Sequence, residues 1–316
     1  MNIKKIAIVM GAVSLTNLSA ARADINVVTS IKPVHSLVSG VMSGVGVPSL
    51  IVDGASSPHT YSLKPSQARQ LQNAKLVFWM GDELEAFLET PIANIANSAT
   101  TIKLIDTHDL KRIKFRDGGM FDDHDHEKHA KKDHDDHGHG EFDPHVWLDP
   151  VNAKALIHAI EEALIKADPE HASTYKANAH KIMAKLDSLV VELSHELEPV
   201  HKKGFIVFHD AYQYFEQRFG VAAVGSITVS PEVMPGAERV SKLRKKISEL
   251  NATCVFSEPQ FQPKLVETLV EGTGARTGVL DPLGATLKKG PDLYFQLLRN
   301  MASSLKKCLK GVAPSA

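Results

Sequence analysis

The stretch INVVTSIKPVHSLVSGVM, residues 25–42, changes from a short apolar run into a helical pattern that a proline opens. Its first part predicts a buried strand at 25–30, and the rest predicts a helix at 33–42. The same alternation continues with predicted strands at 48–52, 75–80 and 101–105 and a predicted helix at 66–73. Continuously apolar strands that alternate with helices favour a parallel sheet covered on both faces, so the fold class is α/β.

A second series of the same kind occupies the C-terminal part of the chain. Strands are predicted at 205–209, 221–226, 253–257 and 276–280, with helices near 211–218, 236–250, 263–271 and 291–309. Two helix-rich stretches, 151–166 and 169–202, separate the series, and the second contains no glycine. We therefore expect an N-terminal lobe (24–168) and a C-terminal lobe (203–316), each a mostly parallel sheet flanked by helices. A long, rigid connecting helix over 169–202 would join them.

The N-terminus predicts export. Lys4 and Lys5 precede an apolar run at 6–15, and Ala21-Arg22-Ala23 provides the small residues of a cleavage site. Residues 1–23 therefore resemble a signal peptide, which places the mature protein in a bacterial periplasm without a lipid anchor. In that oxidising compartment the two cysteines, Cys254 and Cys308, are expected to form a disulfide. The alternative is two unconnected buried thiols.

The charge is nearly balanced overall but uneven along the chain. The 36 basic and 37 acidic residues give a net charge of −1, which argues against a nucleic-acid partner because such partners need a basic surface. Residues 122–141 alone hold eight acidic residues and three lysines. The acidity is thus concentrated in one segment.

That segment, within residues 121–141, is also rich in histidine. Its composition predicts a disordered insertion in the first lobe, because it has almost no aliphatic side chain to bury. A mobile segment loses entropy for each ligand that it brings together, so we expect weak, exchangeable metal sites there. The six histidines concerned are His124, His126, His129, His134, His137 and His139.

Four other residues form a candidate site for one tightly bound metal ion. Ligands of parallel α/β sheets bind at the carboxyl ends of strands, and this rule selects His59, His145, His209 and Asp281. Because two come from each lobe, they can meet only in the cleft between the lobes. Three imidazoles and a carboxylate suit Zn²⁺ better than Ca²⁺ or Mg²⁺, which prefer oxygen. Trp147 and Phe208 are expected to keep the site dry.

Each of these residues has a structural alternative. A single histidine is more often a hydrogen-bonded structural residue than a ligand, and Asp281 before a proline could simply form a turn. The structural interpretation is preferred for the histidines in predicted helices, and His108 is assigned to a loop. The helical histidines are His35, His158, His171, His180, His195 and His201.

Several motifs together resemble a known family. SSPHTYSLKPS, DPHVWLDP, FHDAYQYF, SEPQF and LDPLG occur in the order and spacing of the periplasmic zinc-binding proteins of bacterial high-affinity zinc ABC importers. The resemblance covers essentially the whole mature chain, including the histidine-rich insertion and the cysteine pair. It implies that His59, His145 and His209 hold zinc. The fourth position would be taken by Asp281, a loop glutamate or water, and the absence of a glutamate beside His59 favours Asp281 or water.

The resemblance implies a monomer that captures Zn²⁺ and delivers it to an inner-membrane ABC permease with its cytoplasmic ATPase, without catalysing a reaction. Auxiliary periplasmic zinc proteins are possible further partners. The alternatives are a manganese or iron binder of the same family, and a zinc store or chaperone that acts through the histidine-rich segment. A zinc hydrolase is disfavoured because no H-E-x-x-H motif occurs. Metal affinity should fall as the pH drops through the histidine range, near ~6.5.

Overall fold

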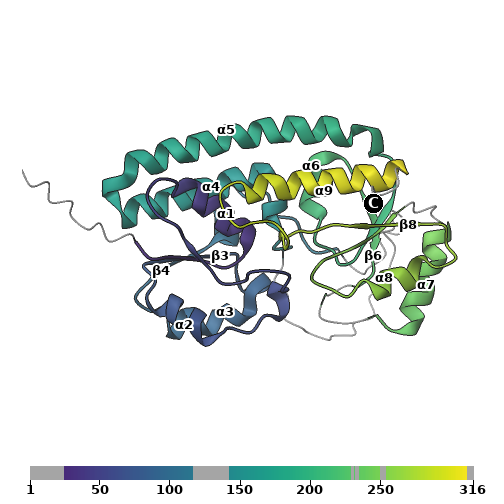
Figure 1. The fold of residues 1–316 in the computed structure, drawn as a ribbon, viewed down its shortest axis with the longest axis horizontal. Helices are drawn as coiled ribbons and strands as arrows, with labels where there is room; N and C mark the ends of the chain where they lie inside the picture. Colours follow the sequence, from purple (N-terminus) through teal and green to yellow (C-terminus); the bar gives the residue numbers. More distant parts are fainter. Residues whose placement is uncertain (1–24, 117–141, 229–230, 232–234, 250–253, 312–316) are drawn as a thin grey trace, which may run out of the picture.

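The computed structural model describes residues 25–116, 142–228, 231, 235–249 and 254–311, which fold into two α/β lobes (Figure 1). The predicted signal peptide lies outside the described residues. Every strand and helix predicted above is present, with ends that differ by a few residues. The two-lobed α/β fold class is therefore confirmed.

The N-terminal lobe contains a parallel sheet in the order β2-β1-β3-β4. Its strands are buried in β1 and β3, where every side chain is apolar or hydrogen-bonded, as expected for a sheet covered on both faces. Its elements are β1 (Val27–Thr29), α1 (Lys32–Val41), β2 (Ser49–Leu50), η1 (Pro58–Thr60), α2 (Pro65–Gln72), β3 (Leu76–Trp79), α3 (Asp82–Asn94), β4 (Thr100–Lys103), η2 (Leu104–Asp106), η3 (Val146–Leu148) and α4 (Pro150–Ala167).

The C-terminal lobe repeats this arrangement with a parallel sheet in the order β6-β5-β7-β8. In both lobes the second strand of the series lies outside the first, so equivalent strand ends face the boundary between the lobes. Its elements are β5 (Phe205–Val207), α6 (Gln213–Phe219), β6 (Ala223–Ser226), α7 (Ala237–Glu249), β7 (Cys254–Ser257), α8 (Lys264–Val270), β8 (Arg276–Val279) and α9 (Leu293–Lys310).

A single long helix, α5 (Ala172–Leu197), runs along both lobes with short 3-10 turns at its ends, η4 (Pro169–His171) and η5 (Glu198–Val200) (Figure 1). It packs against α1 and α4 of the N-terminal lobe and against α6 and α9 of the C-terminal lobe. One hydrophobic cluster includes residues of both lobes and of α5, for example Val28, Leu193 and Leu298. The two lobes therefore share a continuous core, and α5 is the rigid connection that the sequence predicts.

Helix α3 has no counterpart in the sequence prediction. Gly81 precedes it with a φ of 142°, Glu85 interrupts its first turns with non-helical angles, and Pro91 lies inside it. These breaks weaken the periodic pattern that identifies a helix from sequence. The helix matters for the site because it packs against η1, which carries His59.

The predicted disulfide is confirmed. Cys254 of β7 and Cys308 of α9 are bonded, and their Cα atoms are 6.1 Å apart. The bond attaches the last helix to the sheet of the C-terminal lobe.

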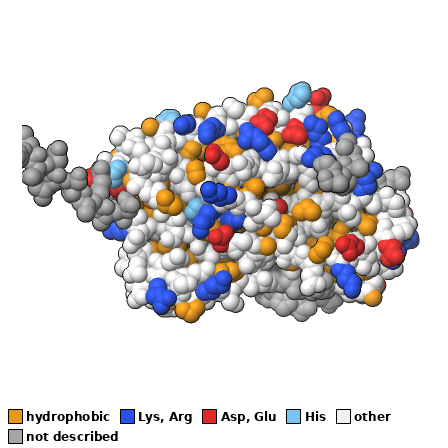
Figure 2. Space-filling model, in the orientation of Figure 1, with side chains coloured by type: hydrophobic (Ala, Val, Ile, Leu, Met, Phe, Trp, Pro, Cys, Tyr) orange, Lys and Arg blue, Asp and Glu red, His pale blue; other side chains and the backbone are white. Residues whose placement is uncertain are grey.

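The surface shows the balanced charge of the sequence. Basic and acidic side chains are interspersed on the face in Figure 2. None of the helices in the described part of the chain has the length and apolar character that a membrane span requires.

Candidate metal centre

The structure brings three of the four predicted residues together between the lobes. The side-chain nitrogens that His59, His145 and His209 offer lie within 4.8 Å of one another. The Nε2 atoms of His145 and His209 are 3.4 Å apart, and the centroid of the His59 ring is 5.6 Å and 5.8 Å from theirs. No second group of three or more possible metal-binding residues of this kind occurs within the described ranges.

His59 is held by a short turn that follows β2. It lies in η1, and the Ser57 hydroxyl accepts a hydrogen bond from its backbone N–H at 3.3 Å. Pro58, just before the histidine, fixes the backbone angle at the start of this turn. The turn packs against α3, so the position of His59 depends on a helix that follows it in the chain.

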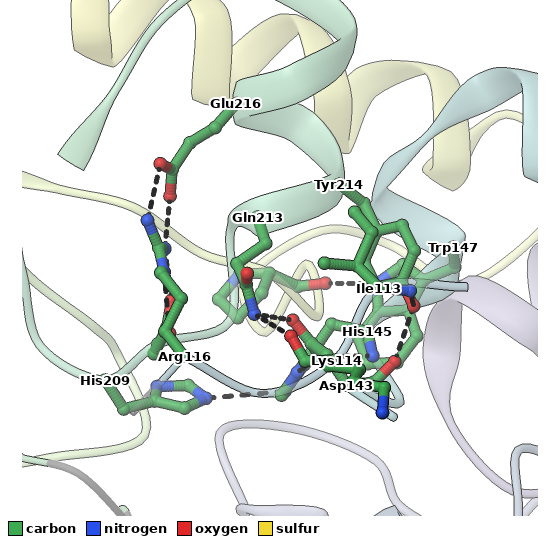
Figure 3. A network of polar contacts seen from close by, with 12 residues as sticks. Ile113, Lys114, Arg116, Asp143, His145, Trp147, His209, Gln213, Tyr214 and Glu216 are labelled. Atoms are coloured by element: carbon green, nitrogen blue, oxygen red, sulfur yellow. Dashed lines mark hydrogen bonds and ion pairs between the residues drawn. The ribbon is translucent and has the colours of Figure 1, made fainter. Parts of the chain in front are cut away.

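His145 is oriented by Asp143, two residues earlier. Asp143 Oδ1 accepts hydrogen bonds from the backbone N–H of His145 at 3.0 Å and from its ring Nδ1 at 2.7 Å (Figure 3). Gln213 donates to the other carboxylate oxygen at 3.0 Å, and the Tyr214 hydroxyl donates to the Asp143 carbonyl at 2.8 Å. Residues of the C-terminal lobe thus hold the carboxylate that orients a histidine from the other side of the cleft.

His209 has an equivalent partner on the neighbouring strand. It follows β5, and its Nδ1 lies 2.7 Å from Oε1 of Glu258, which directly follows β7. Because β5 and β7 are adjacent in the sheet, the two side chains leave its carboxyl edge side by side. Both Glu258 and His209 are buried.

These hydrogen bonds determine how the imidazoles face one another. A carboxylate only accepts, so Nδ1 of His145 and of His209 carries the hydrogen and Nε2 presents a lone pair. Two lone pairs 3.4 Å apart repel each other unless a proton or another cation lies between them. The arrangement therefore favours a cation at this point.

The local pKa values agree with a site that exchanges a proton for a metal ion. Burial lowers the pKa of His145 well below its usual range, and His209 lowers it further. Burial also lowers the pKa of His209, but Glu258 and the nearby Asp210 and Asp143 carboxylates outweigh it, so the net shift is upward. Burial raises the pKa of the Asp143 carboxyl to about 7. In the absence of metal, His209 is the imidazole that takes up a proton.

The geometry fits tetrahedral zinc. Zinc–nitrogen bonds of about 2.0–2.1 Å at the tetrahedral angle would place two nitrogen ligands roughly 3.4 Å apart. The Nε2 atoms of His145 and His209 are separated by 3.4 Å without any rearrangement. Nitrogen ligands oriented by buried carboxylates are also typical of zinc and other borderline-soft metals.

The cavity beside the three imidazoles is small and mostly apolar. Its volume is about 10 Å³, enough for a single atom-sized ligand. Trp147 is fully buried in its wall, with its ring centroid 5.2 Å from that of His145. Phe208 supports the wall from behind, stacked at 4.4 Å on Phe261. The other wall residues are Ser57, Pro58, Leu84, Glu258, Gln260, Pro282 and Leu283.

Asp281 follows β8 as predicted, but its carboxylate turns away from the three histidines. Its oxygens accept hydrogen bonds from the backbone N–H groups of Leu283, Gly284 and Ala285 at 3.1, 2.9 and 2.6 Å. It lines a separate cavity of about 200 Å³ rather than the one beside the imidazoles. In this structure the carboxylate organises the loop that forms one wall of the site.

The same loop is held from the opposite side by a buried lysine. The ammonium group of Lys32, at the start of α1, donates to the carbonyls of Gly284, Ala285 and Leu287 at 3.0, 2.8 and 2.8 Å. Trp147 Nε1 donates to the Pro282 carbonyl at 2.9 Å. The loop at 281–287 is thus fixed to both lobes.

The remaining predicted histidines are placed as follows. His35 is buried in α1, where its ring contacts the Pro48 carbonyl at 3.2 Å and the Ser39 hydroxyl at 3.3 Å, which agrees with a structural role. The six histidines of the insertion, His124 to His139, lie outside the described residues. Asp143, Glu258 and Gln260 were assigned no role from sequence, although Glu258 directly follows a strand and meets the rule that selected Asp281.

Comparison with known proteins gives the family. The family model described as "Zinc-uptake complex component A periplasmic" matches residues 27–308. This chain belongs to that family. It is 55% identical over 304 residues to the high-affinity zinc uptake system protein ZnuA of Brucella abortus, a match that covers 90% of this chain and 91% of that protein. The ZnuA of Yersinia pestis is 37% identical over 295 residues, with the same coverage.

Solved structures agree with this assignment. A crystal structure of ZnuA superimposes with a TM-score of 0.75 at 25% identity and covers 90% of this chain and 98% of that one. The solute-binding protein FpvC from Pseudomonas aeruginosa superimposes with a TM-score of 0.76 at 17% identity, covering 92% and 100%, and shows that the fold is shared more widely.

Proposed function

We propose that this chain captures Zn²⁺ with high affinity in the periplasm and delivers it to an inner-membrane ABC permease. The observation that carries the proposal is the convergence of the His145 and His209 Nε2 atoms, 3.4 Å apart, with both Nδ1 atoms held by carboxylates. The relatives in Brucella and Yersinia are named as zinc uptake proteins, which supports the same cargo here. His59, His145 and His209 are the proposed ligands.

The composition of the site favours zinc over manganese. Mn²⁺ prefers oxygen ligands and a higher coordination number. Here the ligand atoms are nitrogens, the cavity is about 10 Å³, and most of its wall is apolar. A manganese ion would find neither the oxygens nor the space for additional ligands.

The histidine-rich insertion is proposed as an accessory that collects metal weakly near the site. Its two ends are close to the centre, because Lys114 and Phe142 form an antiparallel bridge and Asp143 N–H donates to the Ile113 carbonyl at 2.8 Å. Arg116 pairs with Glu216 at 2.9 Å and also with Asp210, next to His209 (Figure 3). Metal held by the insertion would therefore be near the cleft.

The remaining parts of the proposal follow from family membership. The partner would be a permease with its ATPase, with auxiliary periplasmic zinc proteins as further candidates, and the chain itself would be a non-catalytic monomer. Residues 1–23 would be removed as a signal peptide, leaving lobes at 24–168 and 203–316 joined by the helix at 169–202.

Equilibrium titration of the metal-free protein tests the proposal. We expect one tight zinc site that Mn²⁺ does not displace and that His145→Ala or His209→Ala weakens far more than His129→Ala does. Deleting residues 122–140 should remove the weak additional zinc and keep the tight site. A preference for Mn²⁺ would contradict the proposed cargo, and loss of tight binding in the deletion variant would contradict the proposed site.

A further inference from the structure

Gln260 is a polar residue in the otherwise apolar part of the cavity wall. It lies three residues after β7 and lines the cavity together with the three histidines. Its side-chain oxygen Oε1 is buried and has no hydrogen-bond partner among the described residues. A buried amide oxygen without a partner is unfavourable by about 1–3 kcal/mol, so a donor is expected to satisfy it when the site is in use.

The orientation of this amide is fixed by Asp281. Gln260 Nε2 donates to Asp281 Oδ1 at 3.2 Å. A carboxylate cannot donate, and Asp281 already accepts three backbone N–H groups, so the amide nitrogen must face Asp281. The oxygen Oε1 is therefore the end of the amide that can serve the cavity.

The cavity also lacks a fourth protein ligand for a tetrahedral ion. Asp281 faces the loop at 283–285 and lines a different cavity. Glu258 reaches the centre, but its Oε1 is occupied by His209 Nδ1. A three-histidine zinc site commonly carries water in its fourth position, and a metal-bound water is a strong hydrogen-bond donor.

We propose that Gln260 positions a water molecule that serves as the fourth zinc ligand, by accepting its hydrogen bond at Oε1. Asp281 then acts through Gln260 and through the loop at 283–285, and not as a ligand. Gln260 is thus a positioning residue of the metal centre. This inference rests on the proposed zinc site and adds the identity of its fourth ligand.

Cobalt substitution provides a direct test, because Co²⁺ can replace Zn²⁺ and its visible absorption depends on the ligands. Azide is the probe, since it displaces metal-bound water and has no hydrogen to donate. The variants are Gln260→Leu, Asp281→Asn and the matched control Gln70→Leu. Gln70 lies in α2, away from the cavity lining, and its Oε1 is likewise buried without a partner among the described residues.

We expect azide to change the spectrum of the cobalt-loaded wild-type protein. Gln260→Leu should bind zinc about 10-fold more weakly, since outer partners of metal ligands contribute on this scale. It should bind azide roughly 10-fold more tightly, because the competing water has lost its acceptor and the anion no longer meets the amide oxygen. Gln70→Leu should leave both affinities unchanged, and Asp281→Asn should keep the wild-type cobalt spectrum.

Two results would overturn the inference. The first is an azide-insensitive wild-type spectrum that becomes azide-sensitive in Asp281→Asn, which would make Asp281 the ligand. The second is equal behaviour of Gln260→Leu and Gln70→Leu. Failure of the proposed function would look different, because zinc affinity would then be unaffected by His209→Ala.

Discussion

The Glu258–His209 pair makes a prediction about how zinc binding depends on pH. Glu258 raises the pKa of His209 by its charge and its hydrogen bond, against the opposing effect of burial. The carboxylate therefore has two opposite effects on zinc affinity. It orients the imidazole toward the metal, and it stabilises the protonated form that cannot bind metal. The substitution Glu258→Gln retains the size and a hydrogen-bond acceptor but removes the charge.

The magnitude follows from these two effects. At alkaline pH only the orienting effect operates, and Glu258→Gln should weaken zinc binding about 10-fold. Below the raised pKa of His209, zinc must displace a proton in the wild-type protein, so its dissociation constant rises about 10-fold per pH unit. In Glu258→Gln the upward influence on the His209 pKa is gone, and this rise begins at lower pH. The advantage of the wild-type protein should therefore shrink from about 10-fold to little or none as the pH falls.

Competition titration with a chromophoric chelator from pH 8 to pH 5.5, written here as a range of about those values around the histidine pKa, measures both dissociation constants. Glu192→Gln is the control, because Glu192 pairs with Arg299 on the surface at 2.7 Å and is remote from the cavity lining. It should follow the wild-type curve throughout. A ratio of wild-type to Glu258→Gln affinity that stays constant or grows on acidification would refute the reasoning.

Three further predictions concern stability, measured by urea unfolding of the metal-free protein. Replacing both Cys254 and Cys308 by alanine should lower the free energy of unfolding by about 4 kcal/mol, because the bond joins residues 54 positions apart; an unchanged midpoint would contradict this. Burial lowers the pKa of His35 from 6.5 to about 4, so its stabilising effect is present above pH 6.5 and lost toward pH 4. That loss is about 3 kcal/mol, and His35→Gln should be less sensitive over this pH interval than the wild type. Lys32→Met removes the donor of three backbone carbonyls and should cost about 3 kcal/mol, whereas Lys154→Met, which breaks only an exposed pair with Asp187, should cost less than 1 kcal/mol by the usual scale of about 0–1 kcal/mol.

The sequence predicts the sheets well because their signal is local. Apolar runs such as 75–80 and 253–257 mark buried parallel strands whatever the rest of the chain does. Helix α3 was not predicted, since Pro91 and the kink at Glu85 interrupt its pattern and its helical form depends on packing against other elements. Local periodicity carries no information about such packing.

The metal centre shows a similar division. The strand-end rule brought His59, His145 and His209 to one place, because it depends only on where strands end. The partner of His209 depends on strand order, and β7 lies next to β5 although β6 comes between them in sequence. The direction of the Asp281 carboxylate depends on which backbone N–H groups the following loop presents. Neither can be predicted from a spacing pattern.

The core that runs through both lobes has a consequence for anyone who would build a zinc sensor from this protein. Two fluorophores placed on opposite lobes would report little, because the lobes and α5 share a single hydrophobic cluster and cannot separate far without breaking it. A single environment-sensitive dye near the loop at 281–287 would be better placed. That loop borders the cavity and is attached by hydrogen bonds, so it can shift at lower cost than the lobes can.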